Sequence, residues 1–348
     1  MKRREFLQSS GSVLASSAAG PLIYVPTARA QTPRELKFVL SWLVQSVDAP
    51  TFFARERGYF DKAGLKVTID RGFGSADSVT KVGSGVYHIG EGDLYSMMEY
   101  NAKQTADKQL VAVAVKYQRS PLVIVSPKDK GIDHPFKLIG RTIGDVAGSA
   151  TKRLFPVLAR RVGFDESKVS WANVEARLRE QLMARGQYDA VGAFSLSALP
   201  PLAKMGLPLD KLNVMYYTDY GLDLYGNGLI TTRQLVREQP ELVGGFVRAY
   251  VQGLRDTLAD PATAMELSTK TMRNDPGWDT DVERYRLQLT MDRLYTDPVE
   301  RKSVGIGGVD MKRLETGIRQ VAEGFAIPIV PPTDVFDGRF LQPLADRL

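Results

Sequence analysis

Apolar residues after residue 30 fall into short runs that alternate with stretches of helical spacing. The runs predict strands at residues 36–40, 67–69, 87–90, 110–115, 120–125, 141–144, 189–194 and 228–231. The stretches between them predict helices at residues 50–61, 75–82 and 151–162. Strands that alternate with helices are typical of α/β proteins, so the pattern predicts an α/β fold made of two consecutive blocks.

The last third of the chain is predicted to be helical. Pro240 suits a first helical turn, and apolar residues from Val243 to Leu254 form a wide stripe at helical spacing. Residues 311–321 repeat the same period. A helical C-terminal part therefore follows the two α/β blocks.

The two blocks meet near residues 116–120, and the chain returns near residues 220–232. Two blocks with a crossing and a return indicate two lobes joined by a hinge. We expect lobe I to comprise residues 31–118 plus 233–348, and lobe II to comprise residues 119–232.

The first thirty residues have the order of an export signal. The pair Arg3–Arg4 matches the twin-arginine pattern, a modest apolar stretch follows, and Ala28 and Ala30 frame a small-x-small cleavage site. The apolar stretch is too short and too polar to span a bilayer. We therefore expect residues 1–30 to be cleaved after recognition by the twin-arginine translocation machinery, leaving a soluble periplasmic protein. The alternative is a disordered basic N-terminus of a cytosolic protein.

Composition favours binding over catalysis. The chain has 348 residues, no cysteine and two histidines, His88 and His134. The absence of cysteine excludes thiolate chemistry, and two histidines offer few residues for a histidine-based catalytic triad or metal site. Residues 1–30 hold four basic side chains and one acidic one, so the formal net charge of +6 falls to +3 from residue 31 on. A mild charge without a basic run argues against a nucleic-acid partner. We expect no cofactor and no metal.

Three stretches of the mature chain match a known family in order and spacing. They are residues 49–67, with Gly58-Tyr59-Phe60 inside, residues 82–93 and residues 333–344. They resemble the NMT1/THI5-like family of nitrate, sulfonate, taurine and thiamine-pyrimidine-precursor binding proteins. The resemblance implies a type II periplasmic-binding-protein fold with a ligand cleft between two α/β lobes. It also implies a monomeric substrate-binding protein of an ABC importer, with the ABC permease subunits as partners.

Ligands of open α/β sheets bind beyond the carboxyl ends of the strands. The ligand-binding residues that we predict there are Trp42, Gln45, Glu91, Asp93, Tyr117, Ser149, Thr151, Phe194, Asp223, Tyr225 and Asn227. Trp42 follows the first strand and could stack on a flat ligand, or it could belong to the core. Glu91 and Asp93 could accept hydrogen bonds from ligand amino groups, or could cap the next helix.

The remaining candidates also have two interpretations. Ser149 opens a predicted helix, where it could help to bind an anion or carbonyl or could serve only as the N-cap. Tyr225 and Asn227 suit a polar heterocycle, or belong to a tight turn with the flanking glycines. The stretch Gly72–Asp77 half-resembles a dinucleotide loop, but Asp77 stands where the last glycine belongs, so we reject that interpretation.

Carboxylates beside aromatic rings favour a flat, nitrogen-bearing ligand such as a pyrimidine precursor of thiamine, because carboxylates repel an anion. The alternative is a sulfonate, taurine or nitrate anion, for which Lys116 or Arg119 could supply the positive charge. A thiamine-pyrimidine synthase of the same fold family is a further alternative, which the absence of its cysteine-rich motif disfavours. A sensory binding module without a transporter also stays open.

Overall fold

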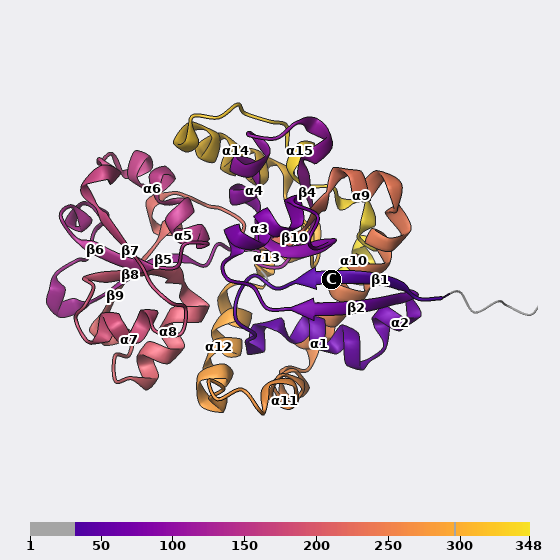
Figure 1. The fold of residues 1–348 in the computed structure, drawn as a ribbon, viewed down its shortest axis with the longest axis horizontal. Helices are drawn as coiled ribbons and strands as arrows, with labels where there is room; N and C mark the ends of the chain where they lie inside the picture. The colour runs from indigo at the N-terminus through magenta and orange to yellow at the C-terminus, as the bar shows by residue number, and fades with distance from the viewer. Residues whose placement is uncertain (1–31, 296) are drawn as a thin grey trace, which may run out of the picture. The chain divides into compact units, whose positions relative to one another are not determined.

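Two five-stranded sheets, each with its own helices, form the frame of the protein (Figure 1). The structure is a computed structural model that describes residues 32–295 and 297–348. Residues 33–348 make one compact unit. The predicted signal peptide, with Arg3, Arg4, Ala28 and Ala30, lies outside the described residues.

The first sheet has the strand order β2-β1-β3-β10-β4. Its strands are β1 (Arg34–Val39), β2 (Leu65–Asp70), β3 (Ile89–Asp93), β4 (Leu110–Val115) and β10 (Asn227–Thr232). β1 runs parallel to β2 and β3, whereas β10 runs antiparallel to β3 and β4. β3 and β4 are buried along their whole length, as expected for strands covered by helices on both faces.

The second sheet has the order β7-β6-β8-β5-β9. Its strands are β5 (Leu122–Pro127), β6 (Thr142–Asp145), β7 (Ser170–Asn173), β8 (Ala190–Phe194) and β9 (Leu212–Tyr216). β6 runs parallel to β7 and β8, and β5 runs antiparallel to β8 and β9. Each sheet therefore contains parallel strands whose carboxyl ends lie on one edge.

The chain crosses from the first sheet to the second between β4 and β5, and it returns before β10. The lobe limits of residues 118/119 and 232/233 stay a proposal. The pairing of β10 with β3 and β4 assigns Asn227–Thr232 to the first sheet, which falls within the range of residues 220–232 predicted for the return.

Helices cover both sheets. Those that follow strands of the first sheet are α1 (Ala49–Glu56), α2 (Tyr59–Lys62), α3 (Ser75–Gly83), α4 (Leu94–Asn101), α9 (Arg233–Glu238) and α10 (Pro240–Ala259). The single helix predicted at 50–61 is divided into α1 and α2, because Gly58 adopts a left-handed φ of 66° between them. The apolar stripe of α10 is buried as predicted, and Phe246 packs on Phe38 with ring centroids 4.9 Å apart.

The second sheet carries α5 (Ala150–Arg153), α6 (Phe155–Val162), α7 (Arg179–Ala184) and α8 (Ser195–Lys204). The C-terminal part consists of α11 (Pro261–Met272), α12 (Thr280–Arg293), α13 (Pro298–Val304), α14 (Met311–Phe325) and α15 (Pro332–Val335). Short 3-10 turns span Ser46–Asp48, Ala106–Lys108, Lys128–Lys130, Pro135–Leu138, Glu166–Lys168, Leu209–Lys211, Tyr217–Tyr220, Gly338–Phe340 and Leu344–Arg347.

The C-terminal helices touch the helices of both sheets. α12 packs against α8, and α14 packs against both α6 and α4 (Figure 1). One buried apolar cluster accordingly includes Ile230 of the first sheet, Ile143 of the second sheet and Ile318 of α14. Within residues 32–295 and 297–348, no helix combines the length and the apolar character that a bilayer crossing requires.

Candidate ligand-binding site

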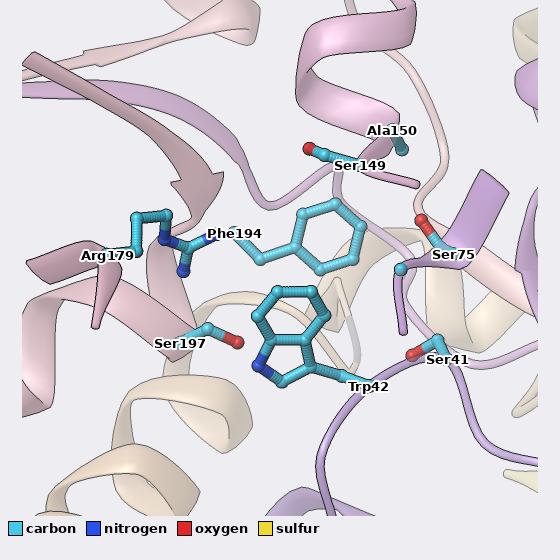
Figure 2. A pocket seen from close by; sticks show the side chains of 9 residues that line it. Ser41, Trp42, Ser75, Ser149, Ala150, Arg179, Phe194 and Ser197 are labelled. Carbon is cyan, nitrogen blue, oxygen red and sulfur yellow. The ribbon is translucent and has the colours of Figure 1, made fainter. Parts of the chain in front are cut away.

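A pocket opens where the carboxyl ends of strands from the two sheets face each other, the position that the fold class predicts. About 300 Å³ in and in front of it, open solvent included, is free of protein atoms, and Figure 2 shows the side chains that line it. Its lining consists of Ser41, Trp42, Gly74 and Ser75 from the loops after β1 and β2, and of Ser149, Ala150, Arg179, Phe194 and Ser197 from the second sheet and its helices.

Two aromatic side chains, one from each sheet, dominate the pocket. Figure 2 shows the indole of Trp42 and the phenyl ring of Phe194 projecting into the same space. Both are half-buried. The guanidinium carbon of Arg179 lies 5.2 Å from the centroid of the Trp42 ring. Aromatic faces at a concave site favour a flat ligand, because stacking adds about 1 kcal/mol per ring pair beyond the burial of area.

Glycine holds the Trp42 loop in place. The backbone N–H of Gly72 donates to the Trp42 carbonyl over 2.9 Å, and that of Gly74 donates to the Ser41 carbonyl over 3.0 Å. A Cβ atom at position 72 would lie 2.1 Å from the Leu40 carbonyl oxygen. Only glycine therefore allows the loop after β2 to lie directly against the loop that carries Trp42.

Arg179 is the one charged side chain among the pocket-lining residues, and it is already paired. Its Nε and Nη2 donate to Glu180 Oε1 over 2.9 and 2.6 Å, and its Nη1 donates to Asp145 Oδ1 over 3.3 Å. Burial alone would lower the pKa of Arg179, but the two carboxylates raise it above its usual value. Burial raises the pKa of Asp145 to about 6, against the opposing effect of Arg179. With both carboxylates ionised, the group carries no net positive charge.

Serine hydroxyls supply the remaining polarity. Ser75 Oγ is buried and has no hydrogen-bond partner among the described residues. Ser149 Oγ accepts from the backbone N–H of Thr151 over 3.1 Å and so caps α5. Ser197 Oγ donates to Gln45 Oε1 over 3.3 Å, which links the two sides of the pocket. Hydroxyls both donate and accept, so they suit a ring that presents N–H and C=O groups.

Loops from the two sheets also meet beside the pocket. The Gly148 carbonyl accepts hydrogen bonds from the backbone N–H groups of Ala76 and Asp77, at the start of α3, over 3.1 and 3.4 Å. A Cβ atom on Gly74 would lie 2.0 Å from the Gly148 carbonyl oxygen. The two loops therefore approach as closely as backbones can.

Of the predicted site residues, Trp42, Ser149 and Phe194 line this pocket, and Gln45 lines a neighbouring compartment. Glu91 does not line the pocket. Its two carboxylate oxygens accept from Lys116 Nζ over 2.9 and 2.8 Å, and it also accepts from the Tyr250 hydroxyl over 3.0 Å. Lys116 donates in addition to Asp48 over 3.0 Å. Burial raises the pKa of Glu91, and the charge of Lys116 opposes that shift.

Asp93, Tyr117 and Thr151 are buried away from the pocket. Asp93 caps α4 by accepting from the backbone N–H of Ser96 over 2.6 Å, which is the capping alternative, and burial raises its pKa to about 6. Tyr117 stacks on Tyr295 with centroids 5.8 Å apart. The hydroxyl of Thr151 faces inward and donates to the Ala193 carbonyl over 2.8 Å.

The residues predicted at the return crossing also lie outside the pocket. Asp223 is exposed and pairs with Arg313 of α14 over 2.9 Å, and the Tyr225 hydroxyl bonds to Glu300 of α13. Asn227 is fully buried in β10, opposite Asp93. Residues of α13 and α14 contact the crossing; the sequence predicts a helix at residues 311–321 but not which part of the protein it packs against.

Sequence reasoning missed Ser41, Ser75, Arg179 and Ser197. A signal existed for Ser75, since Gly72–Asp77 is a glycine loop between a strand and a helix. This stretch lacks the last glycine of a dinucleotide motif, yet its Gly74 and Ser75 form an edge of the pocket. Arg179 lies in a stretch without a recognisable pattern, and only the fold brings it to Trp42.

Comparisons with known proteins agree with this architecture. The sequence model of a family described as NMT1/THI5 like matches residues 45–264. The chain is 26% identical over 280 residues to the riboflavin-binding protein RibY of Chloroflexus aurantiacus. That alignment covers 79% of this chain and 77% of RibY. It is 20% identical over 233 residues to the 4-amino-5-hydroxymethyl-2-methylpyrimidine phosphate synthase of Legionella pneumophila, covering 66% of this chain and 71% of the synthase.

Among solved structures, the alkanesulfonate-binding protein SsuA of Xanthomonas axonopodis pv. citri, bound to MOPS, superposes with a TM-score of 0.65 at 14% identity. The match covers 88% of this chain and 99% of SsuA. The prediction of an α/β periplasmic-binding-protein fold with two lobes is confirmed.

Proposed function

Because this chain belongs to the NMT1/THI5-like family, we propose that it is a solute-binding protein that holds a flat, nitrogen-bearing heterocycle between its two sheets. The observation that carries the proposal is the pair of aromatic side chains, Trp42 and Phe194, that projects into one pocket from opposite sheets (Figure 2). A ring inserted there would contact both sheets at once, so its binding would favour the closed arrangement.

The charge of the pocket supports a neutral or weakly basic ring over an anion. Arg179 is neutralised by Glu180 and Asp145, so a sulfonate or nitrate would meet two carboxylates for one cation. Lys116, the other cation considered for an anion, is occupied by Glu91 and Asp48. Two relatives bear names with flat nitrogen heterocycles, a riboflavin and an aminopyrimidine. The pyrimidine precursor of thiamine remains one candidate of this class, and a flavin is another.

We propose binding without chemistry, although one relative is named as a synthase. The chain has no cysteine. His88 Nδ1 accepts from the backbone N–H of Lys37 over 2.9 Å, and His134 stacks on Phe136 with centroids 5.4 Å apart. Neither histidine lines the pocket. A ligand held there would face hydroxyls, aromatic rings and a paired guanidinium, none of which is an activated nucleophile or base.

The proposal also covers the compartment in which the protein acts. We expect export by the twin-arginine machinery, a soluble monomer in the periplasm, and delivery of the ligand to the permease subunits of an ABC importer. Cell fractionation with the Arg3→Lys, Arg4→Lys double variant tests the route, since the unprocessed protein should then accumulate in the cytoplasm. Periplasmic protein from that variant would contradict it.

A ligand screen tests the binding proposal. Thermal unfolding of the purified protein should shift upward with riboflavin or with 4-amino-5-hydroxymethyl-2-methylpyrimidine, and should not respond to taurine, an alkanesulfonate or nitrate. Trp42→Ala should abolish the shift without lowering the midpoint of the free protein by more than a few degrees. A response to a sulfonate, with both heterocycles inert, would overturn the proposal.

A further inference from the structure

We infer that the ligand extends past Trp42 into a second compartment and places an uncharged, hydroxylated chain there. The inference rests on the proposed function, because it takes the ring of the ligand to lie between Trp42 and Phe194. It adds the chemical class of the substituent, which neither the family nor the fold specifies.

The second compartment adjoins the first. About 780 Å³ in and in front of it, open solvent included, is free of protein atoms, and it shares Trp42, Arg179 and Ser197 with the ring pocket. Its other walls come from the loop after β1, from α7 and α8, and from the α11–α12 loop with the start of α12. These walls are formed by Leu43, Val44, Gln45, Ala176, Arg177, Glu180, Pro201, Met272, Asp275, Gly277, Trp278, Glu283 and Arg286. A substituent that leaves the ring at Trp42 therefore enters a space larger than the ring pocket.

The charges that line this compartment cancel in pairs. Arg177 pairs with Asp275 over 2.8 Å. Arg179 pairs with Glu180 over 2.6 Å.

The third pair is Arg286 with Glu283, at 3.0 Å. Arg286 Nη1 also donates to the Leu196 carbonyl over 2.5 Å, and Glu283 Oε2 also accepts from the backbone N–H of Ser46 over 2.7 Å. Three cations thus face three anions, each already paired. The pairs Arg179–Glu180 and Arg286–Glu283 are buried, whereas Arg177–Asp275 is partly exposed. A phosphate that broke either buried pair would leave a buried carboxylate without its cation, which is costly.

The compartment is nevertheless too polar for an alkyl chain. Trp278 Nε1 is buried and has no hydrogen-bond acceptor among the described residues. The amide of Gln45 and the hydroxyl of Ser197 bond to each other across the boundary with the ring pocket. An alkyl chain would leave the Trp278 N–H unpaired, whereas a ligand hydroxyl can accept from an indole N–H and donate to a carboxylate or amide oxygen.

Four probes separate the ring from its substituent. Riboflavin carries a heterocycle with a neutral polyhydroxylated chain, lumichrome is the ring without the chain, flavin mononucleotide adds a phosphate to the chain, and ribitol is the chain alone. By calorimetry on the purified protein, riboflavin should bind at least tenfold more tightly than lumichrome and at least tenfold more tightly than flavin mononucleotide. Ribitol alone should give no measurable heat.

A substitution tests where the hydroxylated chain of the ligand lies. Trp278→Phe replaces the indole by a smaller aromatic ring without an N–H donor, so it should weaken riboflavin binding about fivefold and leave lumichrome binding unchanged. Trp42→Ala should weaken both. The matched control is Trp171→Phe, because Trp171 lies in β7 and lines neither compartment, and it should change neither affinity.

The outcomes distinguish the two proposals. Lumichrome or flavin mononucleotide binding as tightly as riboflavin, or equal loss of riboflavin and lumichrome affinity in Trp278→Phe, would overturn the second compartment as the chain site while the heterocycle proposal stands. If riboflavin, lumichrome and the aminopyrimidine all fail while a sulfonate binds, the proposed function fails and the inference fails with it.

Discussion

Buried charge in this protein stabilises the frame around the pocket. Lys116 is fully buried and bridges Glu91 of β3 and Asp48 at the start of α1. Of these two carboxylates, only Glu91 is predicted from the sequence as a ligand group, because it follows the strand expected at residues 87–90. The fold instead uses them to fix the segment that leads to Trp42 and Gln45, since Asp48 also accepts from the backbone N–H of Gln45 over 3.0 Å.

Lys116→Met should therefore lower the free energy of unfolding by about 3 to 5 kcal/mol, because it leaves two buried carboxylates without their cation. Urea unfolding followed by tryptophan fluorescence measures this loss. Lys81→Met is the matched control, since Lys81 pairs with Asp77 on an accessible surface and should cost about 1 kcal/mol or less. Equal losses in the two variants would contradict the role given to the buried cluster.

The buried carboxyl group of Asp93 leads to a prediction about how the free energy of unfolding depends on pH. Burial raises its pKa to about 6 from 3.8, so the folded state keeps this proton to a higher pH than the unfolded state does. Stability must then fall as the pH rises from about 4 to about 6 and stay level above that. Asp93→Asn retains an oxygen that can cap α4 and removes this titration.

The gain in unfolding free energy for Asp93→Asn over the wild type should therefore grow by about 2 kcal/mol between pH 4 and pH 7. Asp145, whose pKa is also raised to about 6, is present in both proteins and cancels in the difference. Urea unfolding at several pH values measures the gain. A gain that stays constant with pH would show that Asp93 ionises at its ordinary pKa.

At the scale of elements, the pattern of apolar residues placed most of the strands. Runs of β-branched residues predicted β4 at its observed limits and predicted β5 and β8 to within a few residues. β7 and β9 were missed. β7 reads Ser-Trp-Ala-Asn and has no buried residue, so it lacks the signal of a core strand. α8 was missed as well, because Pro200 and Pro201 lie inside it and proline argues against a helix interior.

The candidate site was less predictable than the fold, for a physical reason. Trp42 and Phe194 directly follow or end recognisable strands, so their positions at the carboxyl edge could be inferred. Arg179 follows no predicted strand, and its contact with Trp42 depends on how two sheets pack. Tyr225 lies beside glycines like a binding loop, but a helix 85 residues further on covers it, since the backbone N–H of Asp310 donates to its hydroxyl.

The contact between the Gly148 loop and α3 gives a prediction at this scale. In Gly148→Ala, the new methyl group would fall 2.7 Å from Asp77 Cβ, so the loop must withdraw from the start of α3. Ligand affinity should drop at least tenfold, because closure would lose the two hydrogen bonds that the Gly148 carbonyl accepts. The unfolding midpoint without ligand should change little.

Ala147→Ser is the control for this loop, because Ala147 is exposed and precedes the contact. It should leave both affinity and stability unchanged. Calorimetry with the ligand identified in the screen provides the affinities. Unaltered affinity in Gly148→Ala would mean that the loop contact plays no part in holding the ligand.

At the scale of the whole molecule, the two sheets share part of one hydrophobic core. One buried cluster contains side chains of both sheets, and α14 contributes Leu314, Ile318 and Val321 to it. α12 joins the sheets a second time, since Leu289 packs into the cluster beneath α8 and Leu287 into the cluster of the first sheet. A domain with a shared core unfolds cooperatively, even if a hinge lets its halves move when folded.

We therefore expect a single unfolding transition, with far-ultraviolet circular dichroism and tryptophan fluorescence giving the same midpoint. The three tryptophans report on different parts, since Trp42 follows β1, Trp171 lies in β7 and Trp278 precedes α12. A ligand at a free concentration of a hundred times its Kd should raise the free energy of the whole transition by about 2.7 kcal/mol. Two separated transitions, of which the ligand moves only one, would mean that the shared cluster does not couple the sheets and that the pocket belongs to one of them alone.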